Sequence, residues 1–422
     1  MNTTTLAMHG GPKAVTLDQT DANRWPILTA EDEAAVIDVM RHGDLSTHPV
    51  TRELEADYKQ RFGRLHAVAH ANGTLALLAA FHALDLKPGD EVLVPSATFW
   101  ASVLPMLWVG AVPVFCEIEG DRFGLDPEDV ERKITPRTRA MVVVHLWGMP
   151  AKMTELRDIA RRHDLRIIED ASHAHGASSR GTPCGAFGDI SVFSLQTQKL
   201  APAGEGGVLM TDDDRYFKRT TCLGDIARII QLQSPERRFA ATSFGIKMRM
   251  APLSSAIARV QLKHLDERNA RRKHNIEWLN AQLEGQGIES FPGPAHVERV
   301  YFENLVRYRP EQFGGLPLEM ALAALQAEGC TVAQPRYPLV HQQPFFTEGH
   351  WRSIARLGDD SDATMINVDG LPLTSTRQQN MMRLPNFPSA TPALLEQYVE
   401  AFAKVRDWAI CCAEASDVQH TA

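Results

Sequence analysis

Cysteine pairs with the spacing of a metal-binding or redox motif are absent from this sequence. The chain of 422 residues has six cysteines, and no two of them have the C-x-x-C spacing of zinc and redox motifs. Nothing in their positions suggests a disulfide framework, so we expect a protein that works in a reducing compartment, the cytoplasm. The six are Cys116, Cys184, Cys222, Cys330, Cys411 and Cys412.

Positive charge is also scarce relative to negative charge. The formal net charge is −8, and a mildly acidic protein has no long-range attraction to nucleic acid or anionic membranes. Residues 1–15 contain no apolar stretch of the kind that forms the centre of a signal peptide. Hydrophobic residues make up 44% and charged residues 23% of the chain, as in ordinary soluble globular proteins. We therefore expect neither nucleic acid nor a membrane as a partner.

One uncharged stretch, residues 92–116, is long enough to cross a bilayer. It contains Pro95, Pro105 and Pro113, and it divides into a strand, a turn, a helix and a second strand. We interpret it as a buried β-α-β segment, with a membrane span as the less favoured alternative.

Short apolar strands alternate with helices through the first half of the chain. The strands are expected at 91–95, 112–116, 140–145, 166–169, 189–194 and 207–211, and the helices at 29–40, 73–84, 100–109 and 153–163. This alternation predicts an α/β fold, in which helices cover both faces of a mostly parallel sheet.

The pattern changes in the second half of the chain. A long helical region is expected at 253–283, followed by a strand at 300–308 and helices at 316–327 and 391–408. Charged residues at the centre of the long helix are interpreted as a solvated face, not as a basic binding patch. We predict a loose N-terminal arm and a large domain over residues 1–265, and a smaller α+β domain over residues 266–422.

Ligands of open α/β sheets bind at the carboxyl ends of the strands, so the residues that follow each strand are the candidates. Residues 71–74 precede a helix and could bind a phosphate through free backbone N–H groups, although an ordinary helix cap is the commoner meaning. Phe99 follows the strand 91–95 and could stack on a planar ligand or pack in the core.

Two ionisable residues follow later strands. Asp170 could pair with a protonated ring nitrogen, or it could bind a metal together with His173 and His175. Lys199 stands five residues after Ser194 and ahead of a glycine-rich turn. A lysine in a pocket can lose its charge and attack carbonyl groups, whereas the commoner fate of a lysine is a solvated surface.

The order of these motifs resembles the DegT/StrS-type family of PLP-dependent sugar and cyclitol aminotransferases, from about residue 10 to residue 408. The motifs are Asn72-Gly73-Thr74, Pro95-Ser96-Ala97-Thr98-Phe99, His145-Leu146-Trp147-Gly148, Glu169-Asp170-Ala171-Ser172-His173-Ala174-His175-Gly176, Phe193-Ser194 with Lys199, Gly204-Glu205-Gly206-Gly207 and Leu384-Pro385-Asn386-Phe387-Pro388. Each motif is weak alone, and together, in register, they are specific. The resemblance implies the aspartate-aminotransferase fold, with pyridoxal 5'-phosphate (PLP) as cofactor.

Roles for individual residues follow from the resemblance. It implies Lys199 as the Schiff-base lysine, Asp170 as the partner of the pyridinium nitrogen, Phe99 stacked on the ring, His173 beside the ring, and Gly73, Thr74 and Ser194 around the phosphate. It also implies transfer of an amino group from glutamine or glutamate to a keto-sugar or keto-cyclitol, in sugar or antibiotic biosynthesis. Lys199 favours transamination, because some dehydratases of the family have a histidine there. A dehydratase, an epimerase or a regulatory protein of this fold stays possible.

One segment departs from the family pattern. Members often have Gly-x-Asn-Tyr-Arg-Met where this chain has Gly245-Ile246-Lys247-Met248-Arg249-Met250. In the family this segment reaches the cofactor phosphate of the partner subunit. We therefore predict a homodimer with shared active sites, to which Lys247 adds a full positive charge. The irregular composition of residues 223–244 leads us to expect contacts with the acceptor there.

Overall fold

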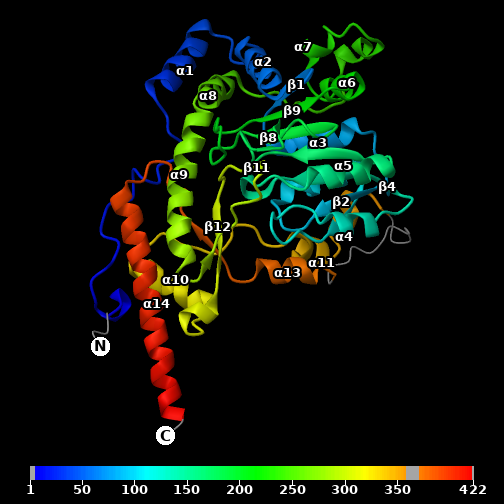
Figure 1. The fold of residues 1–422 in the computed structure, drawn as a ribbon. Coiled ribbons are helices and arrows are strands. Elements are labelled where there is room, and N and C mark those ends of the chain that lie inside the picture. Colours follow the sequence, from blue (N-terminus) through cyan, green and yellow to red (C-terminus); the bar gives the residue numbers. More distant parts are fainter. Residues whose placement is uncertain (1–4, 358–369, 421–422) are drawn as a thin grey trace.

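A seven-stranded sheet forms the centre of the larger part of the molecule, in the order β1-β9-β8-β5-β4-β2-β3 (Figure 1). The computed structural model describes residues 5–357 and 370–420. The strands are β1 (His66–His70), β2 (Glu91–Pro95), β3 (Val112–Cys116), β4 (Thr138–Val144), β5 (Arg166–Asp170), β8 (Ile190–Ser194) and β9 (Gly207–Thr211). Neighbouring strands from β8 to β3 are parallel, and β9 is antiparallel to β1 and β8. The predicted mostly parallel α/β sheet is confirmed.

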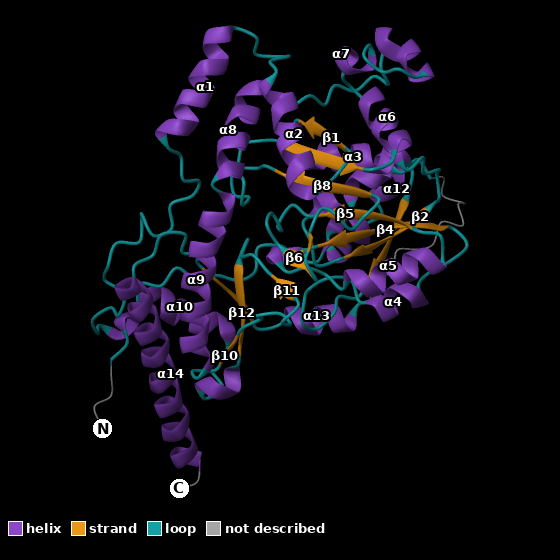
Figure 2. Ribbon diagram, turned by 45° about the horizontal axis from the view of Figure 1, so that its top comes forward, coloured by secondary structure: helices purple, strands orange, loops and turns teal. Residues whose placement is uncertain are grey.

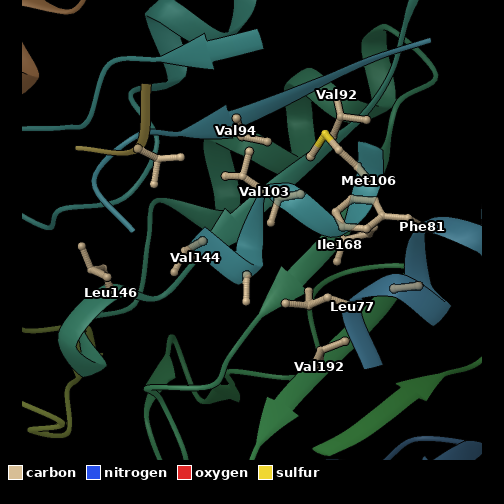
Figure 3. Packing of buried hydrophobic residues seen from close by; sticks show 14 of the residues in the cluster. Leu77, Phe81, Val92, Val94, Val103, Met106, Val144, Leu146, Ile168 and Val192 are labelled. Atoms are coloured by element: carbon tan, nitrogen blue, oxygen red, sulfur yellow. The ribbon is translucent and has the colours of Figure 1, made fainter. Parts of the chain in front are cut away.

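Helices cover both faces of this sheet because alternate residues of the central strands point to opposite sides. Val92 and Val94 of β2 pack with α3 (Gly73–Ala83) and the 3-10 helix η3 (Leu104–Val109). Figure 3 shows this cluster, in which Leu77 and Phe81 of α3 lie against residues of the strands. Leu93 between the two valines packs on the other face, with α5 (Met153–Arg162). Burial on both faces explains why these strands read as continuous apolar runs.

The helix predicted at 100–109 is instead a pair of 3-10 helices, η2 (Trp100–Ser102) and η3. Pro105 stands at the start of η3, and a proline has no N–H to continue an α-helical turn from the residues before it. Residues 92–116 are thus β2, η2, η3 and β3, which contradicts the alternative of a single membrane span. Over the described residues, no helix combines the length and the apolar character that crossing a bilayer requires.

Two helices, α8 (Pro252–Lys263) and α9 (Leu265–Glu284), lead into the smaller α+β part of the molecule. Its three-stranded sheet has the order β10 (Ile288–Glu289), β12 (Asn304–Tyr308) and β13 (Met381–Leu384). Figure 2 shows β10 and β12 beside α9, apart from the larger sheet. Helices α10 (Leu318–Ala327) and α14 (Pro392–His420) complete a separate apolar cluster. We propose that the domain boundary lies near residue 265, where α9 begins.

The N-terminal arm is fixed in place, contrary to the loose arm that the sequence predicted. Leu6 and Val15 are buried in the apolar cluster of the smaller part, together with residues of α10 and α14. The backbone N–H groups of Ala7 and Ala14 donate to the carboxylate of Glu328, at 2.7 and 3.0 Å. The arm then leads to α1 (Ala30–His42) and α2 (Val50–Phe62).

Candidate active site

A cavity of about 450 Å³ opens at the carboxyl ends of β2, β5 and β8 and at the start of α3. The structure brings together seven of the eight site residues that the sequence predicted, because all seven line this cavity. They are Gly73, Thr74, Phe99, Asp170, His173, Ser194 and Lys199. The position agrees with the rule that places ligands outside the carboxyl ends of parallel strands.

Lys199 is buried, with 7% of its surface exposed. Its backbone is fixed on both sides, since its N–H donates to Gln196 O at 2.7 Å and its carbonyl accepts from Trp25 Nε1 at 3.1 Å. Burial lowers the pKa of the Lys199 amine from 10.5 to about 8, and the nearby Asp170 carboxylate partly offsets this effect. An amine with this pKa has a useful neutral fraction near neutral pH, which a solvated lysine lacks.

Asp170 ends β5, and hydrogen bonds fix its buried carboxylate. Ser102 Oγ donates to Asp170 Oδ2 at 2.7 Å, and Ser172 N donates to Oδ1 at 3.1 Å. Ser102 is itself paired with Thr98 Oγ1 at 2.9 Å. These donors orient the carboxylate toward the cavity that Asp170 lines. Ser102 was not predicted as a site residue, because a serine inside a predicted apolar helix gives no signal of this role.

The start of α3 offers backbone donors at one end of the cavity. Asn72 Oδ1 accepts from Leu75 N at 2.8 Å, whereas the N–H groups of Gly73 and Thr74 belong to the first turn, which has no intrahelical acceptors. A Cβ atom on Gly73 would lie 2.8 Å from Ser194 Cβ. Only glycine therefore allows this close packing of α3 against the end of β8, which leaves backbone and hydroxyl donors side by side. Such a corner suits an anion such as phosphate.

His173 lines the cavity and stands in a stack of aromatic rings. The centroid of its ring lies 3.9 Å from the ring centroid of Phe302 and 5.6 Å from that of Trp147, with interplanar angles of 13° and 17°. Burial lowers the pKa of His173 well below its ordinary value, so the ring is neutral. Trp147 N donates to His173 Nδ1 at 3.4 Å. Phe99 is 37% exposed at the cavity, which argues against the alternative that it packs in the core.

The alternative of a metal site at Asp170, His173 and His175 has no geometric support. In the described part of the chain, one group of three possible metal-binding residues has ligand atoms within 4.8 Å of one another, and it consists of His145, Glu169 and Cys184. His175 Nε2 is instead hydrogen-bonded to the hydroxyl of Tyr58 at 3.0 Å.

The buried Glu169 of that group is occupied by hydrogen-bond donors. Its carboxylate accepts from His145 Nε2 at 2.8 Å, and from Phe187 N and Gly188 N, both at 2.9 Å. His145 Nδ1 accepts in turn from Ala151 N at 3.1 Å. With both ring nitrogens and both carboxylate oxygens engaged, this group fixes the loop before β8 and the end of β5.

Three residues reach the cavity from the smaller part of the molecule, Phe302, Arg336 and Tyr337. None of the three was predicted from the sequence. They lie more than a hundred residues after Lys199, outside any motif, and the stretch before Pro338 has no local signal. Phe302 belongs to the predicted strand 300–308, but β12 begins only at Asn304. The ring of Phe302 lies 4.4 Å from Lys199 Nζ.

Lys247 is the predicted site residue that lies elsewhere. It is exposed, and it does not line the cavity of its own chain. Residues 223–244 also lie outside the lining of this cavity. They form α7 (Ile226–Ile229) and the 3-10 helix η5 (Pro235–Ala241), near the top of Figure 1.

The fold and the cavity define an α/β enzyme in which a desolvated lysine and a fixed carboxylate face one binding site. The chain belongs to the DegT/DnrJ/EryC1/StrS aminotransferase family, whose sequence model matches residues 26–391. It is therefore an aminotransferase, and the family that the motifs indicated is confirmed.

Relatives of known name agree with this membership. The L-glutamine:scyllo-inosose aminotransferase of Streptomyces griseus is 34% identical over 79% of this chain and 81% of its own. The L-glutamine:2-deoxy-scyllo-inosose aminotransferase of Streptomyces kanamyceticus is 33% identical over 76% of this chain and 78% of its own. Among solved structures, S. venezuelae DesV has a TM-score of 0.76 at 31% identity, covering 94% of this chain and 99% of its own.

Proposed function

We propose that this aminotransferase uses PLP to move an amino group from glutamine to a keto-cyclitol, in a biosynthetic route of the kind that makes antibiotics. The names of the Streptomyces relatives support the donor and the acceptor class. The observation that carries the proposal is one cavity lined by the buried Lys199, the fixed carboxylate of Asp170 and the anion-binding start of α3.

The donor set of the cavity fits PLP group by group. The N–H groups of Gly73 and Thr74 and the hydroxyl of Ser194 would hold the phosphate, and Phe99 would cover the ring. The Asp170 carboxylate would pair with the ring nitrogen and favour its protonated form. When bound, PLP supplies an electron sink for a carbanion next to the nitrogen of the substrate.

The chain's own residues would carry the proton transfers. The pKa of Lys199 is about 8. This is close to the value at which one group can both take up and return a proton near neutral pH. We assign to Lys199 the proton on the substrate carbon that bears the amino group. His173, neutral and stacked on Phe302, would lie beside the ring of PLP.

We also propose that two copies of the chain share their active sites, in the cytoplasm. Lys247 and residues 223–244 lie away from the cavity of their own chain, which supports a role at the site of a second copy. Ile226, Ile230 and Phe244 of this segment and the nearby Ile246 expose 40 to 47% of their surface, and several exposed large apolar side chains in one stretch of chain favour a protein contact. A charge from Lys247 would complement a phosphate held by neutral donors.

A panel of amino donors and ketones tests the proposed function. We expect glutamine to change the absorbance of the cofactor, and a keto-cyclitol such as scyllo-inosose to restore it and gain nitrogen in an isolated product. Lys199→Ala is the control and should abolish multiple turnover. An isolated product that has lost water and gained no nitrogen would contradict the proposal.

A further inference from the structure

The two substrates of the proposed reaction differ in charge, yet one cavity must accept both. Glutamine has an α-carboxylate, whereas a cyclitol ketone is a neutral polyol. We propose that Arg336 forms the binding site for the α-carboxylate of the amino donor, and that Gln198 occupies this site when the neutral acceptor is bound. This inference rests on the proposed function.

A carboxylate that enters a partly closed cavity needs a cation or strong donors. Among the described residues that line the cavity, Lys199 and Arg336 are the lysine and arginine side chains. Lys199 is desolvated, with its pKa lowered to about 8, and it is assigned to the chemistry. Asp170 and Glu205, which also line the cavity, repel a carboxylate. Arg336 is therefore the group suited to the donor.

Hydrogen bonds position the guanidinium of Arg336. Its Nε donates to Glu303 Oε1 at 2.6 Å, and the side chain of Glu303 is 2% exposed. Arg383 Nη1 lies 3.6 Å from the same carboxylate oxygen. A buried carboxylate that contacts Arg336 fixes the plane of the fork, and a fixed fork is what recognises a carboxylate through two parallel hydrogen bonds.

The Nη1 atom of Arg336 donates to Gln198 Oε1. Gln198 and Arg336 line the same cavity as Lys199, and the charge of Arg336 contributes to the lowered pKa of Lys199. The contact is therefore within electrostatic reach of the reacting amine, near which an α-carboxylate must bind. The amide oxygen of Gln198 is a neutral acceptor in the position that a carboxylate oxygen would take. A carboxylate carries the opposite charge and can accept two parallel hydrogen bonds from the guanidinium, whereas the amide oxygen is neutral and accepts one, so the carboxylate binds more strongly.

The difference in strength makes Gln198 exchangeable. The carboxylate of glutamine would displace the amide from Arg336 and bind in its place. When the polyol binds, no carboxylate is present, and Gln198 returns to Arg336 so that the guanidinium keeps an acceptor. The same cavity thereby accommodates a charged donor and a neutral acceptor in turn.

Binding to the holoenzyme tests the site without turnover. Glutaramate is glutamine without its amino group, and glutaramide replaces its carboxylate with an amide. By calorimetry, we expect Arg336→Gln to weaken glutaramate binding by about tenfold to a hundredfold and to leave glutaramide unchanged. Arg383→Gln is the matched control, because it removes the other arginine at Glu303, and glutaramate should bind to it as to the wild type.

Gln198→Ala tests the exchange and does not depend on the folding of the arginine variant. Removing the competing amide should tighten glutaramate binding several-fold and raise the KM of the keto acceptor. Arg336→Lys keeps the charge without the fork, and its glutaramate affinity should fall between wild type and Arg336→Gln. The KM for glutamine should follow these affinities.

Equal glutaramate affinity in wild type and Arg336→Gln would overturn the site, and loss of affinity in Arg383→Gln alone would move it to Arg383. Weaker glutaramate binding in Gln198→Ala would overturn the exchange. In either case a wild-type enzyme that still aminates a keto-cyclitol from glutamine keeps the proposed function. A wild type that transfers nitrogen from no donor would contradict the proposed function itself.

Discussion

Replacing Lys199 with methionine should make the cofactor-free protein more stable at pH 7. The pKa of Lys199 falls from 10.5 to about 8 when the chain folds, and this difference corresponds to about 3 kcal/mol of unfavourable free energy for the charged form. The ring of Phe302, 4.4 Å from Nζ, returns about 1 kcal/mol to the charged amine. Methionine has a similar length and no charge, so we expect a gain of about 2 kcal/mol in the free energy of unfolding.

The gain should depend on pH in a defined direction. Because the folded pKa is below the unfolded one, the unfolded chain holds more of this proton between about pH 8 and pH 10.5. The stability of the wild type therefore rises with pH through that window relative to Lys199→Met. Below pH 8 the cost of the buried charge is complete, and above pH 10.5 it has gone. The advantage of Lys199→Met should be full at pH 7 and nearly absent at pH 10.5.

Urea unfolding of both cofactor-free proteins, at equal protein concentration and at several pH values, measures this difference. Lys59→Met on the exposed face of α2 is the control, and its stability relative to wild type should vary little across the window. A Lys199→Met protein that is less stable than wild type at pH 7, or a gap that stays constant up to pH 10.5, would refute the reasoning. Either result would mean that the amine is solvated or fully paired in the folded protein.

Four further predictions concern the site residues. Borohydride reduction of the holoenzyme, followed by peptide mapping, should place the pyridoxyl label on Lys199, and a label on any other lysine would refute that assignment. Asp170→Asn should keep the fold by circular dichroism and lower turnover on the order of a hundredfold or more, because a neutral amide cannot hold a ring proton by charge; near-normal single-turnover rates would contradict this. Mixed Lys199→Ala and Lys247→Ala subunits should regain part of the activity when they exchange, and exchange without recovery would mean that Lys247 serves its own chain or none. Exchanging residues 223–244 for those of a relative should change acceptor preference and spare the glutamine half-reaction; if the glutamine half-reaction is lost instead, the segment is structural.

Local patterns in the sequence predict most of the larger sheet. Strands buried on both faces are continuous apolar runs, so β2, β3 and β9 are found at their observed bounds. β1 was missed because its sequence, His66–His70, begins and ends in histidine. α2 was missed because charged residues surround its few buried positions, such as Leu54 and Tyr58. Such elements depend on packing partners from elsewhere in the chain.

Site residues that can be predicted from the sequence differ from the others in carrying a local signal. Strand ends and glycine-rich turns carry local signals, and these led to Lys199 and Asp170. Arg336 and Ser102 carry none, because their places depend on how the smaller part packs against the larger one and on the bend between η2 and η3. Long-range packing is not encoded in the spacing of a few neighbouring residues, so these contacts needed the three-dimensional structure.

The burial of the N-terminal arm has a consequence for synthesis on the ribosome. Leu6 packs in one cluster with Tyr398 of α14, and Figure 1 shows the N-terminal arm beside that helix. At about 5–20 residues per second, roughly 20–80 s separate the synthesis of the two residues. Throughout that time the part of the cluster that α14 supplies is missing, so the apolar residues of the arm are incompletely covered. A helix that is synthesised late thus completes the cover of an arm that is synthesised early.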